Sequence, residues 1–170
     1  GLPQKISPAQ TITIIVKGQD ISQYKYALDN SNYSQPVPVS ETASIDLSDL
    51  DDGKHSISII AGDEAGNWQS ADNAYSDTWV KDTTAPLITG LFNSTKPVLA
   101  RIWTWSANEN ASFRHAINQN ASFEFNSTFE FNSTQKAELQ DVNGTWYLHV
   151  QARDMADNIS KIYTVKALFS

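Results

Sequence analysis

The feature that most constrains this chain is an internal duplication. The segment Gly53–Asn67 (GKHSISIIAGDEAGN) aligns with Gly144–Asn158 (GTWYLHVQARDMADN) at a constant spacing of 91 positions. A second pair, Tyr24–Asp29 (YKYALD) and Phe113–Asn118 (FRHAIN), aligns in the same order at a spacing of 89. Because two blocks recur in order with nearly the same spacing, the chain is expected to contain two copies of one module.

The pattern within each copy predicts an all-β fold. Apolar and polar residues alternate with a period of two, which is typical of a half-buried strand, and no segment shows a convincing helical period. Short strands separated by turn residues favour a β-sandwich in each copy. We place the domains at residues 1–84 and 85–170.

The same alternation predicts which side chains form the two cores. The inward positions are Leu28, Ile57, Ile59, Ala61, Ile117, Leu148, Val150 and Ala152. The outward positions are Ser56, Ser58, His149 and Arg153.

The turn that closes each aligned block is predicted to have the same backbone conformation in both copies. The Asp63 carboxylate can accept hydrogen bonds from backbone amides further along the turn, while Gly66 and Asn67 tolerate positive φ. In the second copy Asp157 replaces the glycine, and aspartate still enters the left-handed region more easily than most residues. We therefore expect Asp63 and Asp154 to stabilise their own turns rather than to bind a ligand.

Three segments of the first copy carry a family resemblance. They are Tyr26–Asp29 (YALD), the run Leu50–Asn67 that ends in Asp-x-Ala-Gly-Asn, and Val80–Pro86 (VKDTTAP). In this combination the chain resembles the tandem immunoglobulin-like (fibronectin III-like) repeat domains of prokaryotic surface and secreted proteins. The resemblance implies an all-β chain of two tandem immunoglobulin-like β-sandwiches, each with about seven strands. It also implies that the Asp-x-Ala-Gly-Asn turn lies between the last two strands and that the Asp-Thr-Thr-Ala-Pro stretch joins one domain to the next. The second copy departs from the pattern at Asn118 and Asp157 and has no such stretch at its end.

Composition and charge exclude several classes of function. The net charge of −7 argues against a nucleic-acid partner, which requires a clustered basic face. The absence of cysteine removes disulfides, thiolate metal sites and cysteine nucleophiles. No apolar run reaches the roughly 18 residues of a membrane span, and no basic start followed by an apolar core marks an export signal, so we expect any signal to have been removed. With three histidines and no recognised catalytic motif, the chain is not expected to be an enzyme.

These observations favour a non-catalytic structural or adhesion module of an extracellular or cell-surface prokaryotic protein. The expected partners are other domains of the same protein or neighbouring subunits. One alternative is a carbohydrate-binding accessory module of a secreted polysaccharide-active enzyme, but Trp103 and Trp105 lie at core spacing, which leaves Trp68 and Trp79 as candidates for exposed aromatics. Another alternative is a filament or lattice subunit in which a terminal strand, such as Gly1–Ser7, completes the sheet of its neighbour.

Glycosylation is the most unusual signal in the sequence. Eight Asn-x-Ser/Thr acceptor sequons occur, where about two or three would arise by chance. The hexapeptide Phe123–Thr128 (FEFNST) is repeated unchanged as Phe129–Thr134 and duplicates a sequon with it. The alternative interpretation is that these residues are ordinary turn formers. The candidate sites are Asn32, Asn93, Asn110, Asn120, Asn126, Asn132, Asn143 and Asn158.

A structural calcium site is the remaining candidate. Without cysteine and with few histidines, only hard oxygen ligands are available, and these suit calcium. In a sandwich of this topology, acidic residues of several loops are expected to converge near the junction of the two copies. The candidate ligands are Asp51, Asp52, Asp82, Glu109, Asp154 and Asp157. The alternative is that these carboxylates are solvated turn residues, and no other cofactor is expected.

Overall fold

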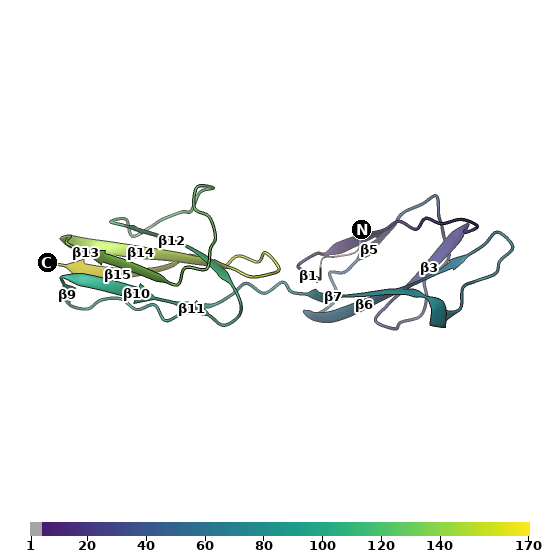
Figure 1. The fold of residues 1–170 in the computed structure, drawn as a ribbon, viewed down its shortest axis with the longest axis horizontal. Coiled ribbons are helices and arrows are strands. Elements are labelled where there is room, and N and C mark those ends of the chain that lie inside the picture. Colours follow the sequence, from purple (N-terminus) through teal and green to yellow (C-terminus); the bar gives the residue numbers. More distant parts are fainter. Residues whose placement is uncertain (1–4) are drawn as a thin grey trace. The chain divides into compact units, whose positions relative to one another are not determined.

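The computed structural model of the protein describes residues 5–170. The chain divides into two compact units, Gly1–Thr83 (unit 1) and Thr84–Ser170 (unit 2), and each unit is described by itself. Apart from a 3-10 turn at Ala71–Asn73, the regular structure of the described residues consists of β-strands (Figure 1). The predicted all-β sandwich fold is confirmed. None of the helical structure in the described part of the chain is long and apolar enough to cross a membrane.

Unit 1 has a large and a small sheet. The large sheet has the order β1-β7-β6-β3-β4, and the small one consists of β2 and β5. The bounds are β1 Ile6–Ser7, β2 Thr11–Ile14, β3 Gln23–Leu28, β4 Val37–Pro38, β5 Ala43–Asp46, β6 Gly53–Gly62 and β7 Tyr75–Lys81. The first strand pairs with the last one in parallel, and the long strand β6 pairs antiparallel with both β3 and β7.

Unit 2 repeats the main features of this arrangement, but it adds the short pair β8 and β11 and has no counterpart of β4. The main sheet has the order β12-β14-β15-β9, and β10 pairs with β13 while β8 pairs with β11. The bounds are β8 Ile88–Thr89, β9 Pro97–Val98, β10 Ala100–Thr104, β11 Ser106–Ala107, β12 Ser112–Asn118, β13 Lys136–Gln140, β14 Gly144–Arg153 and β15 Tyr163–Phe169. As in unit 1, the parallel pair joins an early strand, β9, to the last one.

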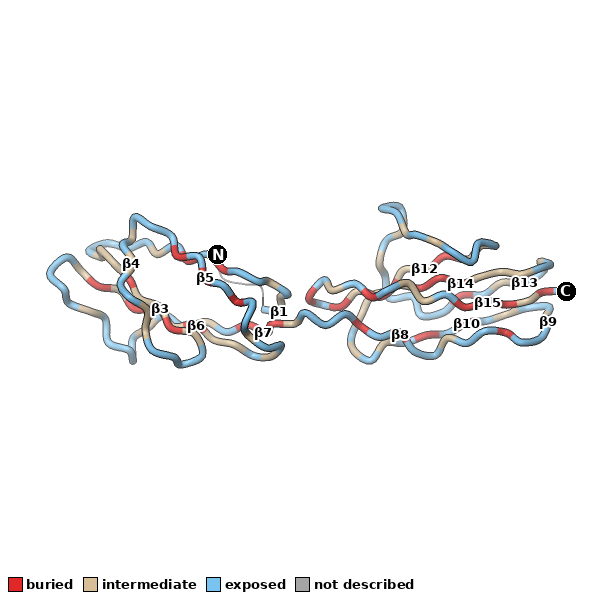
Figure 2. The backbone as a smooth tube through the Cα atoms, turned by 180° about the vertical axis from the view of Figure 1, so that it is seen from behind, coloured by how far each residue is buried: buried red, intermediate tan, exposed pale blue. Residues whose placement is uncertain are grey.

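The predicted inward row is confirmed along β14 and in part along β6. Leu148, Val150 and Ala152 are all 0% exposed, and Ile57 of β6 is 1% exposed. Buried residues alternate with exposed ones along β2 and β5. The backbone coloured by burial shows this alternation along β5 (Figure 2). Most of the aromatic volume of the cores comes from Tyr24 and Trp79 in unit 1, and from Trp103, Trp105 and Phe113 in unit 2.

In unit 1 several residues differ in burial from the predicted inward and outward positions. The inward residues Leu28, Ile59 and Ala61 are only half-buried, whereas Ile60, on the opposite face of β6, is 8% exposed. Ile60 is shielded because the second face of the sheet is also covered. Its cross-strand partner Lys25 extends over the Trp68 ring, with 4.2 Å between the ammonium nitrogen and the ring centroid.

Other residues also differ in burial from the predicted inward and outward pattern. Ser56 and Ser58 are half-buried rather than exposed, and the Tyr33 hydroxyl lies 3.1 Å from the Ser58 hydroxyl. In unit 2 the inward residue Ile117 is half-buried, and so is the outward residue Arg153. Side chains from loops cover faces that strand periodicity assigns to solvent.

His149 is the clearest correction, because it was predicted to be outward and is 0% exposed. The Phe123 ring stacks on its imidazole with 4.9 Å between the centroids. Its Nδ1 contacts the Thr164 hydroxyl at 2.9 Å, and its Nε2 contacts the Asn120 carbonyl at 3.1 Å. The repeated hexapeptide region therefore covers the outer face of β14.

A pair of isoleucine substitutions in unit 1 tests this core. Ile57→Ala should lower the free energy of unfolding by about 2–5 kcal/mol, because it leaves a cavity in a closed core. Ile15→Ala, at a side chain that is 58% exposed, should change it by no more than about 0.5 kcal/mol. Chemical denaturation of both variants is the measurement. Equal losses would show that β6 does not present Ile57 to the core.

Candidate functional site

The Asp-x-Ala-x-Asn turn has the same hydrogen bonds in both units. In unit 1 the Asp63 carboxylate accepts the Asn67 backbone N–H and side-chain amide, both at 2.8 Å. In unit 2 the Asp154 carboxylate accepts the backbone N–H groups of Ala156 at 2.8 Å and Asn158 at 2.9 Å, and the Asn158 side-chain amide at 2.9 Å. The prediction that these aspartates bond to amides of their own turns is confirmed.

Backbone geometry explains why the glycine of this turn can be replaced. Gly66 has φ +85°, and Asp157 has φ +68° at the equivalent position. The left-handed conformation is therefore retained with a residue type that tolerates it. The hydrogen bonds from the Asn67 side chain and backbone lower the pKa of Asp63.

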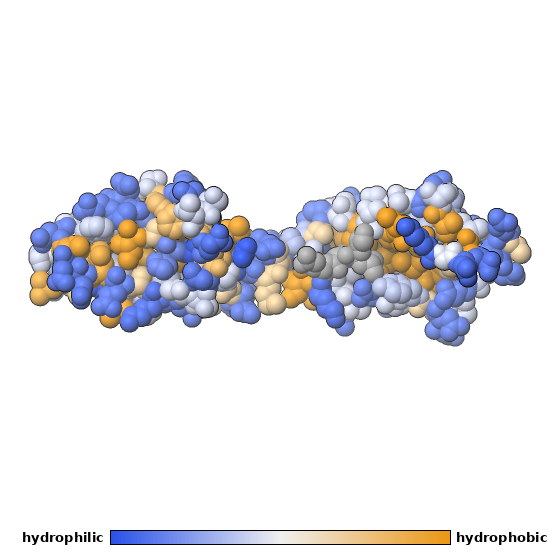
Figure 3. Space-filling view, turned by 45° about the horizontal axis from the view of Figure 1, so that its top comes forward, coloured by the Kyte–Doolittle hydropathy of each residue, from blue (hydrophilic) through white to orange (hydrophobic). Residues whose placement is uncertain are grey.

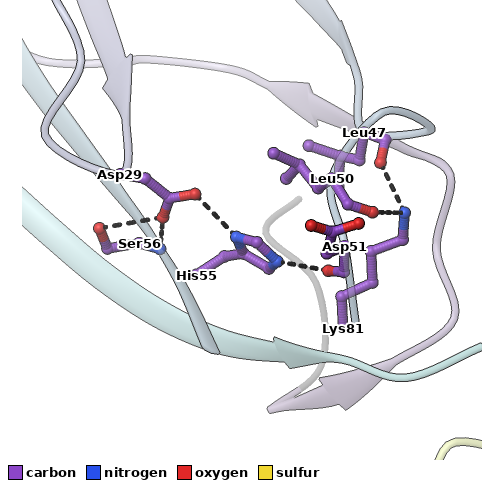
Figure 4. A network of polar contacts seen from close by, with 7 residues as sticks. All are labelled: Asp29, Leu47, Leu50, Asp51, His55, Ser56 and Lys81. Carbon is purple, nitrogen blue, oxygen red and sulfur yellow. Dashed lines mark hydrogen bonds and ion pairs between the residues drawn. The ribbon is translucent and has the colours of Figure 1, made fainter. Parts of the chain in front are cut away.

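The largest polar network of unit 1 links a turn aspartate, a histidine and a loop (Figure 4). Asp29 follows β3 with φ +48°, and its carboxylate accepts the Ser56 N–H at 2.7 Å. The other carboxylate oxygen lies 2.7 Å from His55 Nδ1, while His55 Nε2 lies 2.8 Å from the Asp51 carbonyl oxygen. Both ring nitrogens therefore face acceptors, an arrangement that only the protonated imidazolium satisfies fully.

Charge and hydrogen bonding shift both members of this pair. The hydrogen bond to Asp29, followed by that to the Asp51 carbonyl, raises the pKa of His55. Partial burial alone would raise the pKa of Asp29, but the hydrogen bonds from His55 and Ser56 outweigh it and lower that pKa. A histidine held as a cation between two acceptors is poorly suited to act as a general base, so the network fits a structural role.

Lys81, at the end of β7, anchors the loop between β5 and β6. Its side chain is buried, and Nζ donates to the carbonyl oxygens of Leu47 at 2.8 Å and Leu50 at 2.5 Å (Figure 4). It also donates to the Ser48 carbonyl oxygen at 3.3 Å. A buried ammonium is tolerated because its protons are used by these carbonyls. Sequence reasoning missed this role, since Lys81 was assigned to the connecting stretch.

The predicted calcium ligands belong to both units. In unit 1 the Asp52 carboxylate accepts the Thr83 N–H at 3.0 Å and its hydroxyl at 2.9 Å. In unit 2 the carboxylate of Asp154 is used by its turn, and Asp157 lies 3.7 Å from the Arg153 guanidinium. Asp51, Asp82 and Glu109 complete the predicted set. The site requires both units, so calcium binding stays a prediction.

The repeated hexapeptides form an aromatic cluster in unit 2. The ring centroids of Phe123, Phe125 and Phe129 lie 5.1–5.6 Å apart, each pair in an edge-to-face arrangement. The Arg114 guanidinium lies 4.8 Å from the Phe125 centroid and 4.6 Å from that of Phe131. Sequence reasoning missed this cluster. The alternation Phe-Glu-Phe in each hexapeptide is the signal that could have found it, because alternate residues of an extended segment share one face.

The sequons of this cluster are presented at its surface. Asn126 and Asn132 are exposed, and their Oδ1 atoms accept the backbone N–H of the sequon threonine at 3.0 Å and 2.7 Å. Their amide nitrogens donate no hydrogen bond within the described chain. Asn158 differs, since it is half-buried and its amide donates to Asp154. The other sequon asparagines, Asn32, Asn93, Asn110, Asn120 and Asn143, are exposed.

The tryptophans form no exposed aromatic platform. Trp79, Trp103 and Trp105 are 2–4% exposed. Trp68 is half-buried beneath Lys25, and Trp146 is half-buried with its Nε1–H donated to the Asn143 carbonyl. The expectation that Trp103 and Trp105 belong to the core is confirmed.

Removing the turn carboxylate of unit 2 should destabilise that unit. Asp154→Ala leaves two backbone amides without their acceptor at a position that is 6% exposed, and should cost about 1–3 kcal/mol. The matched variant Asp63→Ala, at the exposed copy of the turn, should cost less because water can replace the carboxylate. Thermal unfolding of both variants is the measurement, and a larger loss from Asp63→Ala would contradict this account.

Because of the Asp29–His55 pair, we expect the stability of unit 1 to be greatest at an intermediate pH. The pKa of His55 is raised in the folded state. Its contribution to the free energy of unfolding is therefore complete below about pH 6.5 and is lost as pH rises through the folded pKa. Because the pKa of Asp29 is lowered, its contribution is present above about pH 4 and is lost as pH falls through the folded value. The effect should be about 1 kcal/mol or less, since Asp29 is 40% exposed and screened by solvent.

NMR titration of the three imidazoles measures this directly. His55 should titrate above the ordinary value, whereas burial lowers the pKa of His115 and of His149, so these two serve as internal controls. In His55→Gln the loss of stability above neutral pH should disappear. A His55 pKa at or below those of the controls would refute the pairing.

Comparison with known proteins supports the fold. No family model matches the chain, and no curated protein matches its sequence. Among solved structures, the fibronectin(III)-like modules of Clostridium thermocellum CbhA align over 97% of this chain and 87% of theirs, with 14% identity and a TM-score of 0.50.

Two further structures align with lower scores. The central fibronectin-III array of RIM-binding protein is 14% identical over 95% of this chain and 64% of its own, with a TM-score of 0.32. A beta-1,2-glucanase from Parabacteroides distasonis is 15% identical over 94% of this chain and 28% of its own, with a TM-score of 0.30. The alignment with the CbhA modules, together with the strand topology, shows that this chain has a fibronectin III-like β-sandwich fold.

Proposed function

We propose that this chain is a non-catalytic structural module of an extracellular or cell-surface protein, and that it carries N-linked glycans. The proposal rests on the hydrogen bonds that the polar side chains make to the backbone. The carboxylates of Asp63 and Asp154, the imidazole of His55 and the ammonium of Lys81 all bond to backbone groups of their own units. These groups stabilise turns and loops, whereas substrate chemistry would need them to face a cleft.

The arrangement of the sequons supports the glycosylated surface. Asn126 and Asn132 lie on a segment held against the sheet by the phenylalanine–arginine cluster, and the bonds to their Oδ1 atoms leave both amide nitrogens facing solvent. A glycan attached there would project from the unit without disturbing its core. At Asn158 a glycan would displace the hydrogen bond to Asp154 and open the turn.

The carbohydrate-binding alternative gains no support from the tryptophans, which are all buried or half-buried. The exposed aromatic rings of the described residues are Tyr75 in unit 1, at 56%, and Phe92 in unit 2, at 71%, so neither unit presents a pair of exposed rings. Strand exchange, the other alternative, is addressed by a feature of unit 1 that is described below.

Analysis of the protein from its source cells tests this proposal. Protease treatment of intact cells should release peptides of this chain, and mass spectrometry should find added glycan mass at Asn126 and Asn132. Asn158 is the matched control, because its amide is engaged and should remain unmodified. A chain found only inside cells would refute the surface role, and unmodified Asn126 and Asn132 would refute the glycan.

A further inference from the structure

Unit 1 has an open apolar groove at one end of its small sheet. The groove is lined by Thr13–Lys17, Ile59 and Tyr75. Two of these side chains are unusually exposed for apolar residues, Ile15 at 58% and Tyr75 at 56%. A hollowed patch of hydrophobic residues is visible on this unit in the space-filling view (Figure 3).

The backbone of Ile15–Lys17, along one side of this groove, is unpaired. β2 ends at Ile14, and no hydrogen bond joins the backbone of Ile15, Val16 or Lys17 to another described residue. An edge of this kind, rich in β-branched residues, readily accepts a further strand.

The duplicated unit shows what belongs in this position. The parallel strands β1 and β9 begin 91 positions apart, and so do the buried pairs Ile12/Ile14 and Trp103/Trp105. The same spacing places Ile15–Lys17 on Ser106–Asn108. There β8 pairs antiparallel with β11, matching Ser106 with Thr89 and Ala107 with Ile88. The Asn108 N–H donates to the Leu87 carbonyl at 3.1 Å, and this donor is equivalent to the N–H of Lys17.

The core of unit 2 depends on this strand. Ile88 of β8 is 5% exposed and belongs to the same apolar cluster as Val150, with Tyr163 packed against it. Val150 pairs with Tyr163 in the sheet as Ile59 pairs with Tyr75 in unit 1. In unit 2 Val150 is 0% exposed and Tyr163 is half-buried, whereas in unit 1 Ile59 is half-buried and Tyr75 is 56% exposed.

No described strand of unit 1 occupies this position. In unit 2 the chain forms β8 first and then β9, the strand that pairs in parallel with the last strand. The strand of unit 1 that corresponds to β9 is β1, which pairs in parallel with β7. β1 is the first strand among the described residues, and none of those residues pairs with Ile15–Lys17.

We propose that the groove of unit 1 binds an extended polypeptide segment from outside Gly1–Ser170. The segment adds an antiparallel strand to Ile15–Lys17 and inserts an apolar side chain against Ile59 and Tyr75, as Ile88 does in unit 2. A glycine after the strand is required, because a Cβ at Gly90 would lie 3.3 Å from the Thr104 carbonyl oxygen and this residue has φ +86°. This inference goes beyond the proposed structural role and does not rest on it.

The first test supplies such a segment to the full chain. A synthetic peptide with the sequence of residues 84–90 (TAPLITG) is added, and amide hydrogen exchange is followed by NMR. The Lys17 amide should gain about tenfold or more in protection, and so should that of Ile15, because alternate amides face the same neighbouring strand. The Val16 amide faces the other way and should change little.

A tethered version removes the demand for high affinity, because a covalent link gives an effective concentration in the millimolar range. Residues 84–96 are placed directly ahead of Ile6 in exchange for the first five residues, which reproduces the spacing in unit 2. The melting temperature of unit 1 should rise, and Lys17 should be protected. The matched control carries aspartate in place of the isoleucine equivalent to Ile88, and should show neither effect.

Surface variants locate the binding. Ile15→Asp should abolish the effect of the peptide, while Leu99→Asp, at an 80% exposed position in unit 2, should leave it unchanged. Absence of Lys17 protection in the tethered protein overturns the proposal. Equal effects from the aspartate control also overturn it. Concentration-dependent protection without any added segment would identify a second copy as the occupant and would overturn the assignment to an outside segment.

Discussion

Each unit is organised around one long strand that is hydrogen-bonded on both sides. β6 and β14 each span ten residues, pair with a neighbour along either edge, and carry the side chains on which the core is built. Because such a strand is shared by both halves of its sheet, its register determines the position of every inward residue. The turns, the capping carboxylates and the buried lysine all act to hold the ends of this strand in place.

The two copies use the same frame but cover it differently. In unit 2 the phenylalanine cluster covers the outer face of β14, where His149 is 0% exposed, and β8 covers the end of the core, where Val150 is 0% exposed. In unit 1 Lys25 and Trp68 cover part of the outer face, and the end of the core is open beside Ile59. A duplication therefore works as an internal comparison, because an element that is present in one copy shows what the other copy lacks.

Polar groups in this protein act locally. Asp63 and Asp154 keep their turns closed, and Asp29 and His55 tie the end of β3 to the start of β6. Such bonds are favourable because the backbone amides at tight turns would otherwise lack acceptors. These four side chains therefore bond to groups of their own units.

The sequence by itself determined the fold class, the duplication, the chemistry of the Asp-x-Ala-x-Asn turn and the core placement of Ile57, Leu148 and Val150. These features depend on residue spacing and on contacts close along the chain, which a linear pattern records. Only the tertiary structure decided the burial of His149, the anchoring role of Lys81 and the open groove beside Ile15. Those outcomes depend on segments far apart in sequence that lie on a strand face or leave it uncovered, and a period of two carries no information about what packs on the second face.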